Sequence, residues 1–440
     1  MKILILTFGS TGDVLPYIAL GDGLTEKGHE VVICTNSRFE NLVVKHGMRY
    51  AYMSDDITQL IESEFGRRMI EGLNGAVGFL RAMCSMIGKI GDIQTRIIND
   101  SWMAVKTNEP DVIVFSPKSF QARHFAEKIG CKAIAAPLFP QHVPTATRPS
   151  LGFPRLGSFN GYNLYTYKIV RGISQLIAGS YIKKWRINHD LSPAFSGIDI
   201  CHDTAGNRIP VINGYSKALI TPPKDYPENV HTCGFWFLQQ APGWVPPTDL
   251  VEFLAQGPAP VYFGFGSMAS VRSKRITAII VEAVTRCGCR AILATGWGGL
   301  SPERLPNNIF QISSAPHDWL FPRVSAVVHH GGAGTTAAGL KAGRPTLICP
   351  IFADQPLWGE IVFQLGAGVA PISQNKLNVL KLSLAINALL HDHRIKMKAL
   401  EIAEQLNGED GIGNAISVIE SVMAYTDCEQ KWMVENYSSN

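Results

Sequence analysis

Short, uninterrupted apolar runs alternate with helical patterns along this chain. Residues 3–8 (ILILTF) form the first run, which is typical of a parallel strand buried on both faces. A helical pattern follows over residues 14–27, Gly28 ends it, and residues 30–34 (EVVIC) begin a second apolar run. This order predicts a strand–helix–strand opening with a right-handed crossover in a parallel sheet.

The same alternation continues to residue 136 and resumes after residue 260. The further predicted strands are residues 112–115, 132–136, 260–266, 290–294, 309–312, 325–329 and 346–350. Residues 57–105 form a long helical stretch rich in Met, Phe, Leu and Gly, which is either a set of packed helices or an insert that lines a groove. The pattern as a whole predicts the α/β class.

A cluster of prolines marks the best domain boundary. It consists of Pro222, Pro223, Pro227, Pro242, Pro246 and Pro247. Because a second strand–turn–helix unit opens after this cluster, we expect two similar α/β domains with a ligand cleft at the carboxyl ends of their strands. We place the first domain at residues 1–225, a linker at 226–248, the second domain at 249–415 and a terminal helical segment at 416–440.

Composition and charge exclude several classes of protein. The chain has 440 residues, of which 46% are hydrophobic and 17% charged, and this argues against a disordered chain. A formal net charge of +4 is too small for a dedicated nucleic-acid binder, so we expect no nucleic-acid partner. Nine scattered cysteines without paired CxxC spacing favour reduced thiols over disulfides or a zinc site.

No targeting or membrane-spanning segment stands out in the sequence. No stretch reaches the roughly 18 consecutive apolar residues that a membrane span needs. The apolar N-terminal run ends at Gly9 without a small-residue cleavage site, so it predicts a first strand rather than a signal peptide. We therefore expect a cytoplasmic protein.

The first candidate for chemistry is the turn Gly9-Ser-Thr-Gly12-Asp13, which follows the first strand. A dinucleotide-binding turn needs GxGxxG at this place and an acidic residue after the second strand, and this chain has neither. Asp13 stands near the start of a helix, where it is either a cap or a carboxylate that faces the cleft as a general base.

The strongest segment is residues 326–359. A strand ends at His329 and His330, and a glycine-rich turn leads into a helix of small residues that begins near Thr335. The N-terminus of a helix offers free N–H groups and partial positive charge, which suit a diphosphate, and His330 with Thr335 or Thr336 would add hydrogen bonds. A structural turn is the alternative. A zinc site is disfavoured because neighbouring residues of a strand point to opposite faces, and an esterase loop because the chain has no G-x-S-x-G nucleophile motif.

Asp354 and Gln355 follow the next strand at the same edge of the predicted sheet. Together they are suited to hold the hydroxyls of a sugar. Turn and capping roles are the alternative for this pair.

These segments, taken in order, resemble family-1 glycosyltransferases, and among them most closely the sterol 3-beta-glucosyltransferase branch. The stretches that carry the resemblance are residues 9–16 (GSTGDVLP), 264–268 (GFGSM), 316–322 (PHDWLFP), 329–345 and 354–359 (DQPLWG). The resemblance is dense in the C-terminal half and at the first loop of the N-terminal half, and it is not detectable by eye between about residues 55 and 220. It implies the GT-B fold, with an acceptor-binding first domain, a donor-binding second domain, and a terminal helix that crosses back to the first domain.

The resemblance also implies a UDP-sugar donor, most closely UDP-glucose. His330 would contact the diphosphate, and Ser267 would also reach the phosphates. Ala315 would contact the uracil through its backbone, and the ring of Trp297 would form one side of the nucleotide pocket. Asp354 and Gln355 would bind glucose hydroxyls. The backbone that would cradle the diphosphate belongs to Gly332, Ala333, Gly334 and Thr335.

By the same resemblance Asp13 is the catalytic base of an inverting transfer to an apolar acceptor, such as a sterol 3-beta-hydroxyl. The chain has no Asp-x-Asp motif, so we expect no metal and no further cofactor. His142, in the loop 137–149, either assists the acceptor or is an ordinary solvent-facing histidine. An apolar acceptor would also bring transient contact with a membrane surface, although the sequence has no polybasic cluster.

Three other functions remain open at this stage. The acceptor could be a polyketide or a phenol, because the divergent first domain would select it. A UDP-sugar epimerase would share the architecture and the donor but would need no acceptor. A non-catalytic UDP-sugar-binding protein would keep the pocket alone.

Overall fold

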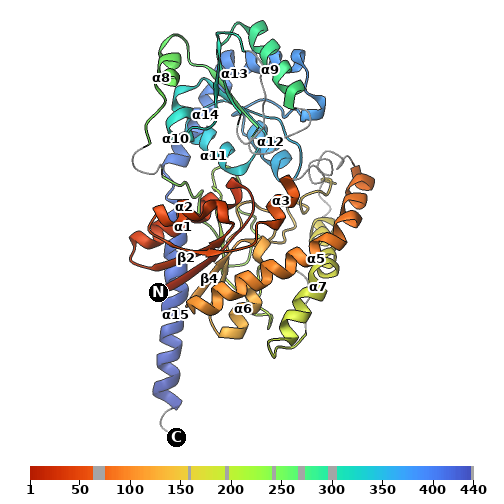
Figure 1. Cartoon of the computed structure of the whole chain (residues 1–440), viewed down its shortest axis with the longest axis vertical. Coiled ribbons are helices and arrows are strands. Elements are labelled where there is room, and N and C mark those ends of the chain that lie inside the picture. Colours follow the sequence, from red (N-terminus) through yellow and green to blue (C-terminus); the bar gives the residue numbers. More distant parts are fainter. Residues whose placement is uncertain are drawn as a thin grey trace.

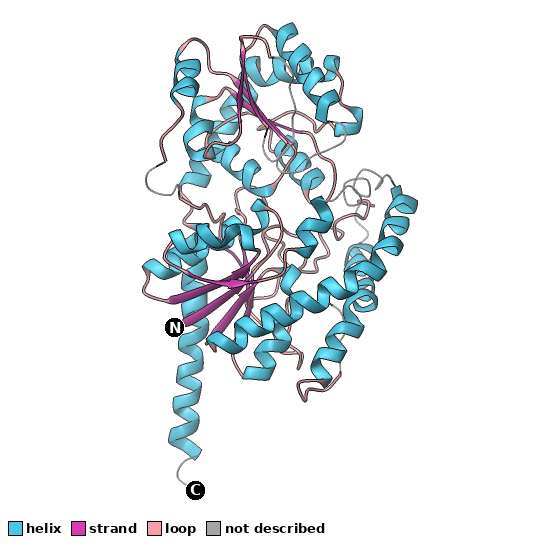
Figure 2. Ribbon diagram, in the orientation of Figure 1, coloured by secondary structure: helices cyan, strands magenta, loops and turns pink. Residues whose placement is uncertain are grey.

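Two parallel sheets, one in each half of the chain, organise the molecule (Figures 1 and 2). The computed structural model describes residues 1–62, 75–156, 160–193, 198–239, 244–265, 273–295 and 305–437. The first sheet has seven strands in the order β3-β2-β1-β4-β5-β6-β7, and the second has five in the order β10-β9-β8-β11-β12. The predicted α/β class is confirmed.

The strands are short, and nine of them lie close to the predicted positions, whereas β3, β6 and β7 were not predicted. The first sheet consists of β1 (Lys2–Leu6), β2 (Glu30–Thr35), β3 (Arg49–Tyr52), β4 (Val112–Phe115), β5 (Lys132–Ala135), β6 (Val211–Asn213) and β7 (Val230–Thr232). The second consists of β8 (Val261–Gly264), β9 (Ala291–Ala294), β10 (Ile309–Ile312), β11 (Ala326–His329) and β12 (Thr346–Ile348).

Helices cover both faces of each sheet. In the first half they are α1 (Thr11–Glu26), α2 (Glu40–Lys45), α3 (Asp56–Glu62), α5 (Gly75–Asn108), α6 (Ala122–Ile129) and α7 (Asn160–Ile187). In the second half they are α8 (Thr248–Ala255), α9 (Ser273–Cys287), α10 (His317–Leu320), α11 (Ala333–Lys341), α12 (Gln355–Gln364), α13 (Val379–His391), α14 (His393–Asn407) and α15 (Gly411–Tyr437).

Side-chain alternation along β1 divides the first domain into two cores. Ile3 and Ile5 pack with residues of α1, α2 and α15, whereas Leu4 and Leu6 pack with residues of α5, α6 and α7. Successive side chains of a strand point to opposite faces, so one apolar run fills both cores. This explains why the first strand reads as a continuous apolar segment.

The terminal helix α15 returns to the first domain (Figure 1). Ile416 and Ile419 are buried in the core that contains α1. Two hydrogen bonds fasten the start of this helix, from the Trp236 indole N–H to the Gly411 carbonyl (3.1 Å) and from the Asn414 amide to the Cys233 carbonyl (2.9 Å). The second half of the chain is thereby tied to the first.

One detail differs from the sequence-based boundaries. Residues 230–232 lie inside the range that proline content assigns to the linker, yet they form β7 at the edge of the first sheet. Proline disrupts a strand only where it stands inside it, and Pro227 precedes β7. The predicted helical stretch 57–105 overlaps α3 and α5. Ile93, Ile97 and Val105 of α5 pack in the helix–sheet core, while residues 63–74 lie outside the described residues.

Among the described residues, no helix is both long enough and apolar enough to cross a membrane.

The contact of α15 with the first domain predicts a large effect of one substitution. Ile416→Ala should destabilise the first domain by about 2–5 kcal/mol, because Ile416 is almost fully buried and its loss leaves a cavity. Urea denaturation followed by intrinsic fluorescence measures this. The solvent-exposed Ser421→Ala on the same helix is the control and should leave the midpoint nearly unchanged.

Candidate functional site

The candidate site lies where the order of the strands reverses in each sheet. In the first sheet, β1 has β2 on one side and β4 on the other, and in the second, β8 lies between β9 and β11. Loops that follow such neighbouring strands diverge and leave a crevice at their carboxyl ends. The polar side chains described below follow β1, β2, β4 and β5 of the first sheet and β11 and β12 of the second.

Asp13 is held at the first of these points by the turn between β1 and α1. Ser10 caps α1, and Asp13 is the third residue of the helix. Its Oδ2 atom accepts hydrogen bonds from the Ser10 N–H and the Ser10 hydroxyl, both at 2.8 Å. Asp13 therefore completes a capping box and still exposes a quarter of its side chain.

The turn itself depends on Gly9. Its φ of +127° disfavours any side chain, and a Cβ atom there would stand 2.6 Å from Asp13 Oδ2 and 3.1 Å from Lys118 Nζ. The Gly9 N–H donates to the Asn36 amide oxygen at 2.9 Å, and the Arg38 guanidinium donates to the Gly9 carbonyl. The end of β2 thus fixes the turn that positions Asp13.

Lys118 is the direct partner of Asp13. It follows β4, and its Nζ atom lies 2.6 Å from Asp13 Oδ1. Burial by itself raises the pKa of Asp13, but the Lys118 ammonium and the Ser10 hydrogen bonds outweigh burial and hold this pKa below its usual value. Asp13 is accordingly a carboxylate at neutral pH.

His142 lies near the same ion pair. It is half-buried beside Phe139, with ring centroids 6.1 Å apart. Burial, with a smaller contribution from the Lys118 charge, lowers the pKa of His142 to about 4, so the ring is neutral. His142 is thus only partly exposed to solvent, and its predicted contact with the acceptor stays a prediction.

The turn between β11 and α11 forms the wall of the cleft on the side of the second domain. Gly331 has a φ of +100°, and a Cβ atom there would stand 2.6 Å from the Ile348 side chain and 3.1 Å from the Gln355 carbonyl oxygen. Only glycine lets this turn pass so close to the start of α12. The buried His329 accepts a hydrogen bond from the Gly331 N–H at 3.0 Å, which further fixes the turn.

The N-terminus of α11 is open to a ligand. Gly332 is the N-cap residue and supplies no capping side chain. The next residues are Ala333, Gly334 and Thr335, whose N–H groups belong to the unpaired first turn of a helix. A Cβ atom on Gly334 would meet nothing within 4 Å. The Thr336 hydroxyl is already used within the helix, because it donates to the Gly332 carbonyl at 2.9 Å.

His330 lies against this helix start. A Cβ atom on Gly332 would stand 2.8 Å from His330 Nε2, so the ring covers Gly332. Burial lowers the pKa of His330 to about 4, in spite of an opposing backbone hydrogen bond with Gly264. A neutral imidazole brings no charge and has a single N–H, so His330 can donate to an anion only with an N–H that is not bonded to the Gly264 carbonyl.

Asp354 and Gln355 occupy different positions at the start of α12. The Trp358 indole N–H donates to Asp354 Oδ2 at 2.8 Å. Burial is the main cause that raises the pKa of Asp354 to about 6; the charge of Asp13 adds to it, while the Trp358 bond and Lys118 oppose it. Asp354 is therefore close enough to Asp13 and Lys118 to interact with both, although it belongs to the other domain.

Gln355 is almost fully buried. Its side-chain oxygen accepts a hydrogen bond from the Ile351 N–H at 2.8 Å and so braces the loop before α12.

The remaining predicted positions divide into two groups. Ala315 is half-buried and stands just before α10, at the edge of the apolar cluster around Tyr262. Ser267 and Trp297 lie outside the described residues, so their predicted contacts with the phosphates and the nucleotide stay predictions.

Sequence reasoning missed Lys118 and Asn36. Each follows a strand that neighbours β1 in the parallel sheet. Their roles follow from the strand order 2-1-4, which brings the ends of β2, β1 and β4 together. The sequence alone does not give that order.

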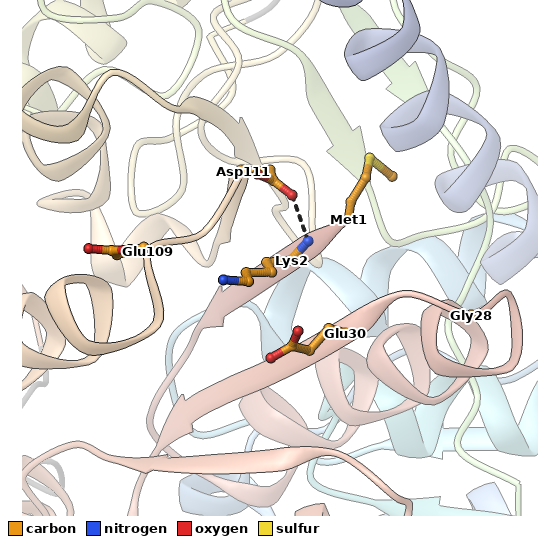
Figure 3. Close-up of a pocket in the computed structure, with 6 residues that line it drawn as sticks. All are labelled: Met1, Lys2, Gly28, Glu30, Glu109 and Asp111. Carbon is orange, nitrogen blue, oxygen red and sulfur yellow. Dashed lines mark hydrogen bonds between the residues drawn. The ribbon is translucent and has the colours of Figure 1, made fainter.

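A pocket of about 440 Å³ lies at the amino ends of the strands of the first sheet (Figure 3). It is lined by Met1, Lys2, Gly28, Glu30, Glu109 and Asp111. The Lys2 N–H donates to Asp111 Oδ2 at 2.7 Å, which ties the amino ends of β1 and β4 together. Because it lies at the amino ends of the strands, this pocket is separate from Asp13 and α11.

Two domain families match the chain. Residues 3–146 match the glycosyltransferase family 28 N-terminal domain, and residues 271–411 match the erythromycin biosynthesis protein CIII-like C-terminal domain. The matches fall on the two halves that carry the two sheets.

Curated relatives are similar over nearly the whole chain. The chain is 33% identical over 438 residues to the sterol 3-beta-glucosyltransferase of Penicillium rubens, with 97% of this chain and 31% of that protein covered. The sterol 3-beta-glucosyltransferase of Aspergillus fumigatus is 34% identical, with 97% of this chain and 30% of that protein covered. The chain thus spans about a third of the length of the curated relatives it matches.

Solved glycosyltransferases share the fold. The glycotransferase of kitacinnamycin has a TM-score of 0.69 at 18% identity, covering 96% of this chain and 98% of that chain. The calicheamicin glycosyltransferase CalG4 has a TM-score of 0.66 at 18% identity, with 97% and 98% covered. VinC, solved in complex with dTDP, has a TM-score of 0.65 at 16% identity, with 96% and 100% covered. These likenesses confirm the expected GT-B fold.

The turn before α11 gives a matched pair of substitutions. Gly331→Ala should destabilise the protein by at least about 1–2 kcal/mol, since it places a side chain at positive φ and against Ile348 and Gln355. Gly334→Ala, three residues away in open space, should be neutral or slightly stabilising. Chemical denaturation of both variants measures the difference, and equal effects would contradict the assigned geometry.

Proposed function

This chain belongs to the glycosyltransferases of the GT-B fold, and we propose that it transfers glucose from UDP-glucose to the 3-beta-hydroxyl of a sterol. The observation that carries the proposal is the meeting of Asp13, from the first domain, with Asp354 and the open start of α11, from the second. A group-transfer enzyme needs a base and a leaving-group site on opposite sides of one reacting bond. The sterol acceptor is supported by the curated relatives, which are sterol 3-beta-glucosyltransferases.

The donor lies on the second domain in this proposal. The diphosphate sits at the N-terminus of α11, where the N–H groups of Ala333, Gly334 and Thr335 and the helix dipole favour negative charge. Neutral His330 adds a hydrogen bond. Among the predicted partners of the glucose hydroxyls, Asp354 faces the cleft, and Gln355 holds the loop around it.

The acceptor lies on the first domain, against Asp13. As the acceptor oxygen bonds to the anomeric carbon, its proton passes to the Asp13 carboxylate and the bond from that carbon to the diphosphate oxygen breaks. UDP leaves with the electron pair of that bond. Attack opposite the leaving group inverts the centre, so an α-linked donor gives a β-glucoside.

No metal takes part in this proposal. The start of α11 and the hydrogen bond from His330 stabilise the charge that develops on the leaving UDP, as fixed dipoles do in other transfer enzymes. Lys118 supplies a positive charge beside Asp13, in the first domain.

The test is a product assay with the purified chain, UDP-glucose and EDTA. Sterols, phenols and macrolides are offered in parallel, and mass spectrometry detects a hexose adduct. We expect a β-linked sterol glucoside, identified by the coupling constant of its anomeric proton, and weaker use of dTDP-glucose. An adduct confined to phenols or macrolides would contradict the sterol acceptor, and sugar conversion without any acceptor would indicate an epimerase.

The variant Asp13→Asn tests the proposed base in the same assay. It should lower transfer by about 10²–10⁴-fold, because it removes the base and keeps the size of the side chain. UDP affinity measured by calorimetry should stay the same, since the diphosphate lies on the other domain. Full turnover in this variant would rule out Asp13 as the base.

Lys118 predicts a shift of the pH profile. It lowers the pKa of Asp13, so Lys118→Met should raise this pKa and move the acid limb of kcat/KM to higher pH. Activity is then lost at mildly acidic pH, where the wild type still works. Lys118→Arg keeps the positive charge and should therefore keep the wild-type pH profile of kcat/KM. The distant Lys381→Met should also leave this profile unchanged. An unmoved acid limb in Lys118→Met would contradict the role of the ion pair.

A further inference from the structure

Helix α7 carries a line of exposed apolar side chains. Tyr165, Leu176 and Ile187 are 60%, 86% and 59% exposed, and they follow one another at intervals of 11 residues. Eleven residues are about three helical turns, so the three side chains lie on one face of the helix. Figure 1 shows α7 beside α5 at the outer edge of the first domain, away from α15.

Every charged residue of the same helix is basic. Its 28 residues include five Lys and Arg and no Asp or Glu. Lys168, Lys183 and Lys184 are exposed, and Lys168 and Lys183 stand within one turn of Tyr165 and Ile187. The other two are paired, Arg171 with Asp199 at 2.9 Å and the buried Arg186 with Glu127. We call the face formed by Tyr165, Lys168, Leu176, Lys183 and Ile187 the α7 face.

We propose that the α7 face docks on the surface of a bilayer that contains anionic lipid. Apolar side chains flanked by lysines on one helix face are the pattern of a helix that lies in a membrane interface. Lysines near an anionic surface add attraction that an uncharged surface lacks. A second copy of this chain is a poor fit, since two like-charged faces would repel each other.

The α7 face is connected to the acceptor side of the cleft. The Asn163 side-chain amide donates to the Ala146 carbonyl at 2.8 Å, and the Ser150 N–H donates to the Thr166 hydroxyl at 2.8 Å. The start of α7 is thereby fastened to the loop that contains His142. A sterol that leaves the bilayer beside α7 would enter the cleft next to this loop, so the inference deepens the proposed function and rests on it for the identity of the acceptor.

Vesicle binding tests the surface directly. Sedimentation compares vesicles of phosphatidylcholine with vesicles that also contain phosphatidylglycerol. The wild type should bind the anionic vesicles, and the double variant Leu176→Ser with Lys183→Glu should bind them about tenfold or more weakly. The control is Leu384→Ser with Lys381→Glu on α13, which changes an exposed leucine and lysine of the other domain in the same way.

The control variant should bind like the wild type, and thermal melts verify that both variants are folded. Equal binding by the α7 variant and the wild type, equal loss in the control, or no preference for anionic vesicles would each overturn the proposal. A wild-type dimer that the α7 variant dissociates would also overturn it in favour of a second copy of the chain.

Activity separates this inference from the proposed function. The α7 variant should keep its turnover of sterol delivered in cyclodextrin and lose most of its turnover of sterol held in anionic vesicles. A wild type that glucosylates sterol in neither form would refute the sterol acceptor, while the vesicle-binding result would still decide whether α7 docks. Equal loss with both forms of sterol would overturn the docking role of α7.

Discussion

The site depends on the apolar packing that holds the two domains together. Phe235, which follows the first sheet, packs with Trp358 of α12 in a cluster that also contains Leu340 of α11, and the Phe235 and Trp358 ring centroids are 6.0 Å apart. Trp358 is fully buried, and its indole N–H holds Asp354. One side chain therefore joins the packing between the domains to the polar wall of the cleft.

Burial and charge give the two acidic residues of the cleft different properties. Asp13 and Asp354 are both sheltered, yet the pKa of Asp13 is lowered by Lys118 and the Ser10 hydrogen bonds, while burial raises the pKa of Asp354 to about 6. Carboxylates whose environments separate their pKa values are suited to separate roles. Asp13 remains ionised as a base requires, and Asp354 can pass between hydrogen-bond acceptor and donor near neutral pH.

Much of the fold could be predicted from the sequence, because buried parallel strands form continuous apolar runs and most of these were found. The glycine turn at His330–Gly332 and the acidic position Asp13 were also predictable, since each directly follows such a run. The strand order was not, and for that reason Lys118 and Asn36 were missed. The burial of Gln355 could not be predicted either. The residues around it in the sequence do not distinguish a side-chain amide that binds a ligand from one that hydrogen-bonds to its own loop. The basic face of α7 was missed because its charges are spread along a helix and form no cluster in the sequence.

The central claim is that one donor bridges the two domains, with its diphosphate at α11 and its anomeric carbon opposite Asp13. A crystal structure with a non-transferable 2-fluoro analogue of UDP-glucose tests it most directly. The account predicts the diphosphate at the N–H groups of Ala333, Gly334 and Thr335, and an open path from the Asp13 carboxylate to the anomeric carbon. A diphosphate bound elsewhere, or an anomeric carbon turned away from Asp13, would contradict it.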